Sequence, residues 1–306
     1  MKKRMFMVLA AGMTVAMVAC GTETPAGEPA PVAAEAAEPT EEAAPTEAEP
    51  TEAEAEPTEA EAEPTEAEAA EGDVMSHADY VAASVDDAVK VDVYVQATQS
   101  WWEDKITVYA ADEDGAYFIY NMACSEEDSA KLTQGAHILV NGFKAEWSGE
   151  VEIADATFEF VDDTTFVVDK AEDVTDLLGK DELIDHQNEF VAFNDLEVAA
   201  KQDADGNDVA FLYNWDGSGE PGSDLYFDVK AADGNVYTFT VESYLCGQDT
   251  DVYKAVEGLK VGDKIDAEGF LYWYEGVNPH ITSVKVVEQK AAETNVADGG
   301  RIMMIP

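Results

Sequence analysis

The sequence predicts an all-β protein in which one small domain, made of five strands and one short helix, occurs twice. Two observations lead to this prediction. From about residue 76, short runs alternate apolar with polar residues, which is typical of half-buried strands. Turn-forming pairs such as Asp114-Gly115 and Asp233-Gly234 separate the runs, and the order of strands and helix in the first half repeats in the second.

The N-terminus reads MKKRMFMVLAAGMTVAMVAC, in which a basic start precedes an apolar run too short for a comfortable membrane span. This pattern predicts a signal peptide over residues 1–19. The segment Met17-Val18-Ala19-Cys20-Gly21 resembles the lipobox of bacterial lipoproteins, with Met17 where Leu is usual. The resemblance implies that Cys20 is diacylated, and that the exported protein is anchored to the outer face of the bacterial cytoplasmic membrane, at the cell surface. An ordinary signal peptide with an incidental cysteine is the alternative.

Residues 21–72 consist almost entirely of Ala, Glu, Pro and Thr, and PTEAEAE repeats from Pro50 and from Pro57. Recurrent proline interrupts helices, and closely spaced glutamates repel one another. With the lipidated Cys20, residues 20–72 are therefore predicted to form a disordered, extended tether.

The first domain is predicted over residues 73–162. Apolar residues at alternate positions from Val89 to Ala97 indicate a strand, and residues 105–122 indicate a hairpin. Ser125 is a plausible N-cap for a helix that ends by Gly135. Two strands follow, over residues 137–147 and 151–161. The expected order is β-β-β-α-β-β.

The second domain is predicted over residues 176–289, after a linker at 163–175 and before a flexible tail at 290–306. A strand at 189–200, a hairpin at 225–245, a helix at 247–262 and strands at 264–274 and 280–287 repeat the order of the first domain. Residues 170–187 suggest a short helical connector. Aligning the copies places Cys124 beside Cys246 and Gly142 beside Gly269, and we expect both cysteines to be buried, unpaired thiols.

Five strands with a helix between the third and fourth resemble the OB-fold, a small, partly open Greek-key barrel. The chain resembles bacterial lipoproteins that carry tandem OB-fold-like domains on acidic tethers, a family whose members mostly lack an assigned activity. The resemblance implies two tandem five-stranded barrels. It also implies ligand binding across strands 2 and 3, flanked by the 1–2 and 4–5 loops.

Tryptophans recur in these loops, which makes them candidate ligand-binding residues. The first copy carries Trp101 and Trp102 in its 1–2 loop and Trp147 at its 4–5 loop, and the second carries Trp215 and Trp273 at the matching places. In an extended chain, one of Trp101 and Trp102 faces inward and the other outward. Packing against the barrel core, or between domains, is the alternative role for all five. Further aromatics on strands 2 and 3 are Tyr109, Tyr117, Phe118, Tyr120, Tyr226 and Phe227.

The net charge is -49, and residues 73–306 retain 49 of the 66 acidic residues against 14 of the 17 basic ones. Such a surface repels phosphate backbones, so we expect no nucleic-acid partner and negligible affinity for single-stranded DNA. Acidic residues beside the tryptophans, such as Glu103, Glu146 and Glu150, suit hydrogen bonds to sugar hydroxyls.

No motif supports catalysis. The four histidines lack metal-binding spacing, and the chain has neither a Gly-x-Ser-x-Gly elbow nor a Walker-type loop. The segment Asp203–Asp208 departs from the calcium-loop pattern and suggests a hairpin tip. We expect no enzyme activity, no cofactor and no metal site.

Three functions stay open: a surface binding module for a glycan or protein ligand, an envelope spacer without a small ligand, and an accessory subunit of an exported complex.

Overall fold

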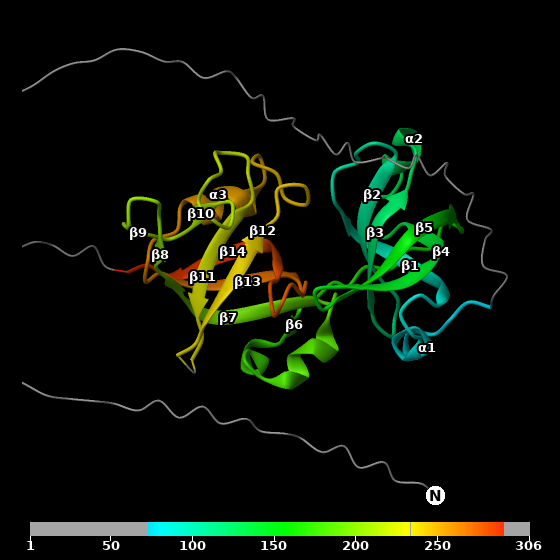
Figure 1. Ribbon diagram of the computed structural model, residues 1–306, viewed down its shortest axis with the longest axis horizontal. Coiled ribbons are helices and arrows are strands. Elements are labelled where there is room, and N and C mark those ends of the chain that lie inside the picture. The colour runs from blue at the N-terminus through cyan, green and yellow to red at the C-terminus, as the bar shows by residue number, and fades with distance from the viewer. Residues whose placement is uncertain (1–72, 233, 291–306) are drawn as a thin grey trace, which may run out of the picture. The chain divides into compact units, whose positions relative to one another are not determined.

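The computed structural model describes residues 73–232 and 234–290. The predicted signal peptide, Cys20, the tether and residues 291–306 of the tail lie outside this part of the chain. Figure 1 shows two groups of strands that follow one another along the sequence. Both belong to one compact unit.

The first group is a closed barrel in which the strands follow the order β1-β2-β3-β5-β4. Strand β1 pairs with both β2 and β4, which closes the barrel, and β3 runs parallel to β5 through Ile119 and Ile153. This arrangement is the Greek-key order of the OB-fold. Its elements are β1 (Ala88–Thr98), β2 (Lys105–Ala111), β3 (Ala116–Ala123), α2 (Glu126–Ser129), β4 (His137–Trp147) and β5 (Glu150–Phe160).

The second group repeats this topology. Strand β7 pairs with both β11 and β13, and β12 runs parallel to β14 through Thr240 and His280, so five strands again close on themselves. Its elements are β7 (Phe190–Ala199), β11 (Leu225–Lys230), β12 (Val236–Val241), α3 (Asp251–Glu257), β13 (Lys264–Phe270) and β14 (His280–Glu288). The predicted fold class, all-β with two tandem OB-fold-like barrels and one short helix in each, is confirmed. The domain limits stay a prediction.

Each barrel is filled by the inward side chains of its alternating strands. In β1 the inward residues Val91, Val93 and Val95 have no exposed surface, as the period of two in the sequence requires. The short helices begin where the sequence offers a cap, because Ser125 and Thr250 each accept a hydrogen bond from the backbone N–H three residues later. Short-range sequence signals therefore predict which side chains fill the core of each barrel and where its short helix begins.

Short elements surround the barrels. Strand β6 (Glu172–Asp173) pairs with β7, and the 3₁₀ helices η1 (Thr175–Leu177) and η2 (Asp181–His186) stand where a helical connector is predicted. The insertion after β7 contains the hairpin β8–β9 and strand β10. Their bounds are Lys201–Gln202, Asp208–Val209 and Leu212–Tyr213. No helix in the described residues is long and apolar enough to cross a bilayer.

Helix α1 (His77–Ala82) has no counterpart in the sequence prediction. It buries Tyr80 in the core of the first barrel. The ammonium of Lys144 donates hydrogen bonds to the carbonyl oxygens of Tyr80, Val81 and Ala83, at 3.0, 2.8 and 2.9 Å. A cation is stabilising at a helix C-terminus, where the last carbonyls lack partners within the helix.

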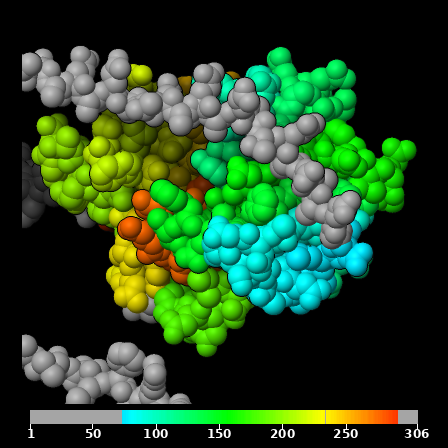
Figure 2. Space-filling view, turned by 45° about the vertical axis from the view of Figure 1, so that its right-hand side comes forward, coloured from blue at the N-terminus to red at the C-terminus, as the bar shows by residue number. Residues whose placement is uncertain are grey.

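Aromatic residues join the two barrels. Tyr109 and Phe118 of the first barrel form a buried cluster with Phe270 of the second, and the rings of Tyr109 and Phe270 stack with centroids 4.2 Å apart. Beside this cluster, the backbone N–H of Glu275 donates to the carbonyl of Ser148, at 2.8 Å. In Figure 2, the orange surface of the segment around β13–β14 lies against the green surface of the chain between β4 and β7. The two barrels therefore share a packed interface.

Cys124 and Cys246 are free and buried, as expected. Burial is the main reason why the pKa of each thiol is raised to about 11. Both are therefore inert core residues rather than nucleophiles.

Candidate functional site

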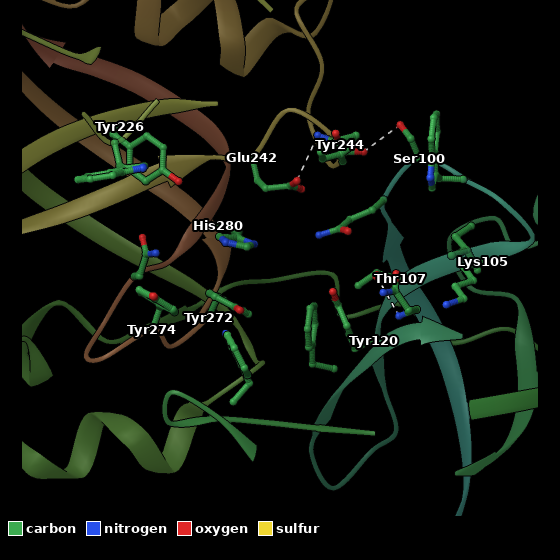
Figure 3. Close-up of a pocket in the computed structure, with 18 residues that line it drawn as sticks. Ser100, Lys105, Thr107, Tyr120, Tyr226, Glu242, Tyr244, Tyr272, Tyr274 and His280 are labelled. Carbon is green, nitrogen blue, oxygen red and sulfur yellow. Dashed lines mark hydrogen bonds between the residues drawn. The ribbon is translucent and has the colours of Figure 1, made fainter. Parts of the chain in front are cut away.

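A pocket of about 860 Å³ opens between the two barrels. The first barrel contributes β2, β3 and the tips of its β1–β2 and β4–β5 connections. The second contributes β11, the loop after β12, the β13–β14 loop and Trp215 of the insertion. Figure 3 shows Lys105, Thr107 and Tyr120 on one side of this space, and Tyr226, Tyr272 and Tyr274 on the other. The strand 2–3 face of the first barrel, where OB-folds bind ligands, is one wall.

Exposed aromatic side chains gather at this pocket. Trp102, Trp147 and Trp215 are 68%, 61% and 74% exposed, and all three line it. Every exposed tyrosine of the described residues lines it as well, namely Tyr120, Tyr244 and Tyr274. Large apolar side chains are seldom left in water together unless they serve binding or association. This convergence marks the pocket as the candidate site.

Two tight turns hold two of the tryptophans at the edge of the first barrel. Trp102 and Lys105 exchange both backbone hydrogen bonds, at 3.0 Å, around Glu103 and Asp104, which both have positive φ. Trp147 pairs with Glu150 around Ser148 and Gly149, again with positive φ at both central positions. Positive φ at both central residues characterises the type I′ turn, which favours two-residue hairpins. Each tryptophan therefore stands at the first position of a rigid turn.

Trp101 and Trp273 lie elsewhere. Trp101 packs against the core of the first barrel, and its indole N–H donates to the carbonyl of Cys124 at 2.8 Å. Trp101 therefore faces inward and Trp102 outward, as the alternation indicates. Trp273 packs against the core of the second barrel and against Gly149, where a Cβ atom would lie only 2.7 Å from the indole. The structure thus brings together three of the five predicted residues, and their role in ligand binding stays a prediction.

The polar groups of the pocket are mostly neutral. Lys105 and Glu242 are its charged side chains, and Gln99, Ser100, Thr107, Asn121 and Asn278 supply amides and hydroxyls. Burial, followed by the nearby Asp224, raises the pKa of Glu242 to about 7. Its carboxylate accepts hydrogen bonds from the backbone N–H groups of Tyr244 and Leu245, at 3.3 and 2.9 Å.

The acidic neighbours of the tryptophans do not line the pocket. The expectation that they hydrogen-bond a ligand stays a prediction. Glu150 is fully buried instead and accepts a hydrogen bond from the backbone N–H of Trp273, at 2.8 Å.

Several residues that line the pocket are not predicted from the sequence. Among the aromatics named on strands 2 and 3, Phe118, Tyr120 and Tyr226 reach the pocket, whereas Tyr109, Tyr117 and Phe227 are buried. The missed residues include Glu242, Tyr244, Tyr272, Tyr274 and His280. The alternation in Tyr272-Trp273-Tyr274 is the one signal that separates pocket-facing from inward-facing residues here. It identifies neither the pocket nor its opposite wall.

Two other polar clusters contain potential metal ligands. Asp203 accepts hydrogen bonds from the backbone N–H groups of Asp205 and Asn207, at 2.9 and 2.8 Å, in the turn of the β8–β9 hairpin. This confirms the hairpin prediction. Glu172, His186 and Glu189 bring one potential ligand atom each within 4.8 Å of one another near β6 and β7. His186 and Glu189 already pair with each other, at 2.8 Å.

Neither a protein-family model nor a curated protein matches this chain. Among solved structures, the p204 HINb domain is 14% identical, with a TM-score of 0.31, and the match covers 67% of this chain and 100% of that one. A murine DNA-binding protein bound with double-stranded DNA is 12% identical, with a TM-score of 0.33 and coverage of 65% and 99%. The p202 HIN1 domain in complex with a 12-mer double-stranded DNA is 12% identical, with a TM-score of 0.32 and coverage of 66% and 94%. The strand order described above, rather than these distant matches, carries the fold assignment.

The exclusion of nucleic acid as a partner is corrected by these findings. Three of the matching structures hold double-stranded DNA, so proteins matched to this chain include DNA binders. The physical reason for the error is that a net charge describes a whole chain and not one site. The lining of the pocket is close to neutral, with one lysine and one glutamate, although the chain carries a net charge of -49.

Proposed function

We propose that this protein is a non-catalytic binding module whose pocket between the barrels holds an oligosaccharide. The observation that carries this proposal is the convergence of every exposed tryptophan and tyrosine of the described residues on one pocket. Sugar rings present flat faces of C–H groups, which pack on aromatic rings, and a rim of hydroxyls. OB-folds bind oligosaccharides as well as oligonucleotides at this part of the barrel.

The lining suits such a ligand in two further ways. Its amides and hydroxyls are neutral partners for sugar hydroxyls, and a pocket of this size falls within the range of small-molecule sites. Tight turns hold the backbone at Trp102 and Trp147, so little backbone entropy is lost when a ring stacks on them.

Replacing Trp102, Trp147 or Trp215 with alanine is expected to weaken oligosaccharide binding about tenfold for each change, because exposed aromatic anchors carry much of the binding energy in such sites. The melting temperature should hardly change, because these side chains are mostly in water. A glycan array identifies the ligand, and calorimetry with wild-type and variant proteins measures its affinity.

Trp101→Ala is the matched control, because it removes a packed side chain that does not line the pocket. It should lower the free energy of unfolding by about 3 kcal/mol. The proposal fails if no glycan binds while an oligonucleotide does so in a manner that depends on Trp102, or if the three exposed tryptophans can be removed without effect on glycan affinity.

We further propose that Cys20 carries the lipid that holds this module at the cell surface. The support is the sequence of residues 1–21 and the composition of residues 21–72, which predicts an extended tether. Cys20→Ser should move the protein from the membrane fraction to the soluble fraction, as seen by immunoblotting of fractionated cells. Retention of this variant in the membrane contradicts the lipid anchor.

A further inference from the structure

His280 is a buried polar side chain of the pocket. It is the first residue of β14 and only 7% exposed, and its ring stacks on Tyr272 with centroids 4.3 Å apart. Its Nδ1 atom lies 2.9 Å from the hydroxyl oxygen of Tyr109, which belongs to the first barrel. No hydrogen bond to its Nε2 atom exists among the described residues, and Figure 3 shows the ring in the space between the barrels.

The contact with Tyr109 determines where the proton of His280 resides. The hydroxyl of Tyr109 is fully buried and has Nδ1 as its only partner in the described chain. A buried hydroxyl that only accepted this bond would leave its own hydrogen without an acceptor, which is costly. Tyr109 therefore donates to Nδ1, and the hydrogen of the neutral ring resides on Nε2. Burial also lowers the pKa of His280 to about 3, so the ring stays neutral.

A second neutral donor stands near His280. The side-chain oxygen of Asn278 accepts a hydrogen bond from the hydroxyl of Thr240, at 2.8 Å. This bond orients the amide and leaves its NH₂ group available. Both oxygens of Glu242, the carboxylate of the pocket, already accept backbone N–H groups. The floor of the pocket, formed by His280 and Asn278, therefore offers two neutral donors, the Nε2–H group and the amide NH₂ group.

We infer that this floor binds the carbonyl oxygen of an acetamido group, so that the sugar in the pocket is an N-acetylated amino sugar. A carbonyl oxygen accepts two hydrogen bonds and brings no hydrogen of its own, whereas a sugar hydroxyl also needs an acceptor. The methyl of the acetamido group packs against the aromatic rings of Phe118 and Tyr272, which line the same pocket. An anionic acceptor is disfavoured because His280 carries no charge. This inference rests on the proposed function.

The protonation state is tested without any ligand. Nitrogen-15 NMR of the histidine ring in the wild-type protein distinguishes the two neutral tautomers from the imidazolium. We expect the tautomer with hydrogen on Nε2 between pH 5 and pH 8. Tyr109→Phe removes the hydroxyl that fixes this tautomer, and should therefore produce a mixture. Hydrogen on Nδ1, or an imidazolium signal, in the wild-type protein overturns the inference.

The ligand class is tested with two trisaccharides, one of β-1,4-linked N-acetylglucosamine and one of β-1,4-linked glucose. The wild-type protein should bind the acetylated one at least about tenfold more tightly, because the other lacks the acceptor that the site is built to bind. The double variant Tyr109→Phe/His280→Phe removes the donor without leaving an orphaned hydroxyl, and it should lose this preference while still binding through the tryptophans.

The outcomes separate the two claims. Equal binding of both sugars by the wild-type protein, or an undiminished preference in the double variant, overturns the acetamido inference and leaves the proposed function standing. Binding of neither sugar, together with a glycan array without hits, overturns both. If the double variant does not fold, Asn278→Leu replaces it, with the same loss of preference expected.

Discussion

Gly269→Ala is expected to lower the free energy of unfolding of the second barrel by about 3 kcal/mol, the upper part of the usual cost of overpacking. Gly269 lies at a bulge in β13, where the pairing with β14 shifts register. A Cβ atom there would lie 2.2 Å from the carbonyl oxygen of His280 and 2.7 Å from the Cα atom of Ile281. These are backbone atoms of β14, so they cannot move without disturbing the sheet. Chemical denaturation followed by fluorescence measures the loss.

Gly247→Ala is the matched control for this prediction. A Cβ atom at Gly247 makes only an ordinary contact, 3.5 Å from the carbonyl of Ser243, and its backbone does not have the positive φ that disfavours alanine. Its stability should stay within about 0.5 kcal/mol of the wild type. If Gly269→Ala proves as stable as Gly247→Ala, the close approach of β13 and β14 does not exist in solution.

The same geometry recurs in the first barrel. A Cβ atom at Gly142 would lie 2.6 Å from a side-chain carbon of Ile153 and 2.8 Å from the carbonyl of Ala154. Gly142 also lies in a region of shifted register, between Asn141 and Phe143 of β4. Aligning the two halves of the sequence pairs Gly142 with Gly269, and the structure gives the reason. In each copy the fifth strand approaches the bulged fourth strand too closely for a side chain.

The stability of the folded protein is expected to fall as the pH rises from about 4.5 to about 8, because of Glu150. Burial, opposed mainly by the hydrogen bond from the backbone N–H of Trp273, raises the pKa of this carboxyl to about 8, from 4.5 in the unfolded chain. Between these values the folded state binds the proton and the unfolded state does not, so stability decreases with pH by at most about 1.4 kcal/mol per unit. Below 4.5 and above 8, Glu150 contributes no slope.

Oxygen atoms without a hydrogen-bond donor around Glu150 explain why its protonated form is favoured in the folded protein. One carboxyl oxygen accepts hydrogen bonds from the backbone N–H of Trp273 and from Gln187, at 2.8 and 3.2 Å. The other oxygen has no partner in the described residues, and neither does the side-chain oxygen of the neighbouring Asn188. A protonated carboxyl supplies the hydrogen that such acceptors lack, whereas a carboxylate supplies none.

Glu150→Gln separates this effect from the general repulsion of an acidic surface. The amide imitates the protonated acid at every pH, so the variant should match the wild type at pH 4 and exceed its stability by at least about 2 kcal/mol at pH 8. Denaturant titrations at the two pH values measure both differences. Parallel curves for wild type and variant across this range would show that Glu150 ionises normally, and that the interface around it is open to water.

Sequence patterns predict which residues lie inside each barrel, but they do not predict which surfaces of the two barrels meet. Alternation places Val91, Val93 and Val95 inward and separates Trp101 from Trp102, because a strand has only two faces. It does not distinguish Trp147, which faces the pocket, from Trp273, which packs beneath it, since both precede a turn in matching positions. Which faces of two domains meet depends on the fit of their whole surfaces. The cluster of Tyr109, Phe118 and Phe270 is not encoded in any short segment.

The division of the pocket lining between the two barrels has a thermodynamic consequence. A ligand that contacts both walls binds only when both barrels are folded and docked. Its binding free energy therefore stabilises the docked state and couples the folding of one barrel to the folding of the other. Without ligand, the shared aromatic cluster and the hydrogen bonds of the β4–β5 hairpin supply this coupling. An occupied pocket adds to it, so the ligand and the interface between the barrels stabilise each other reciprocally.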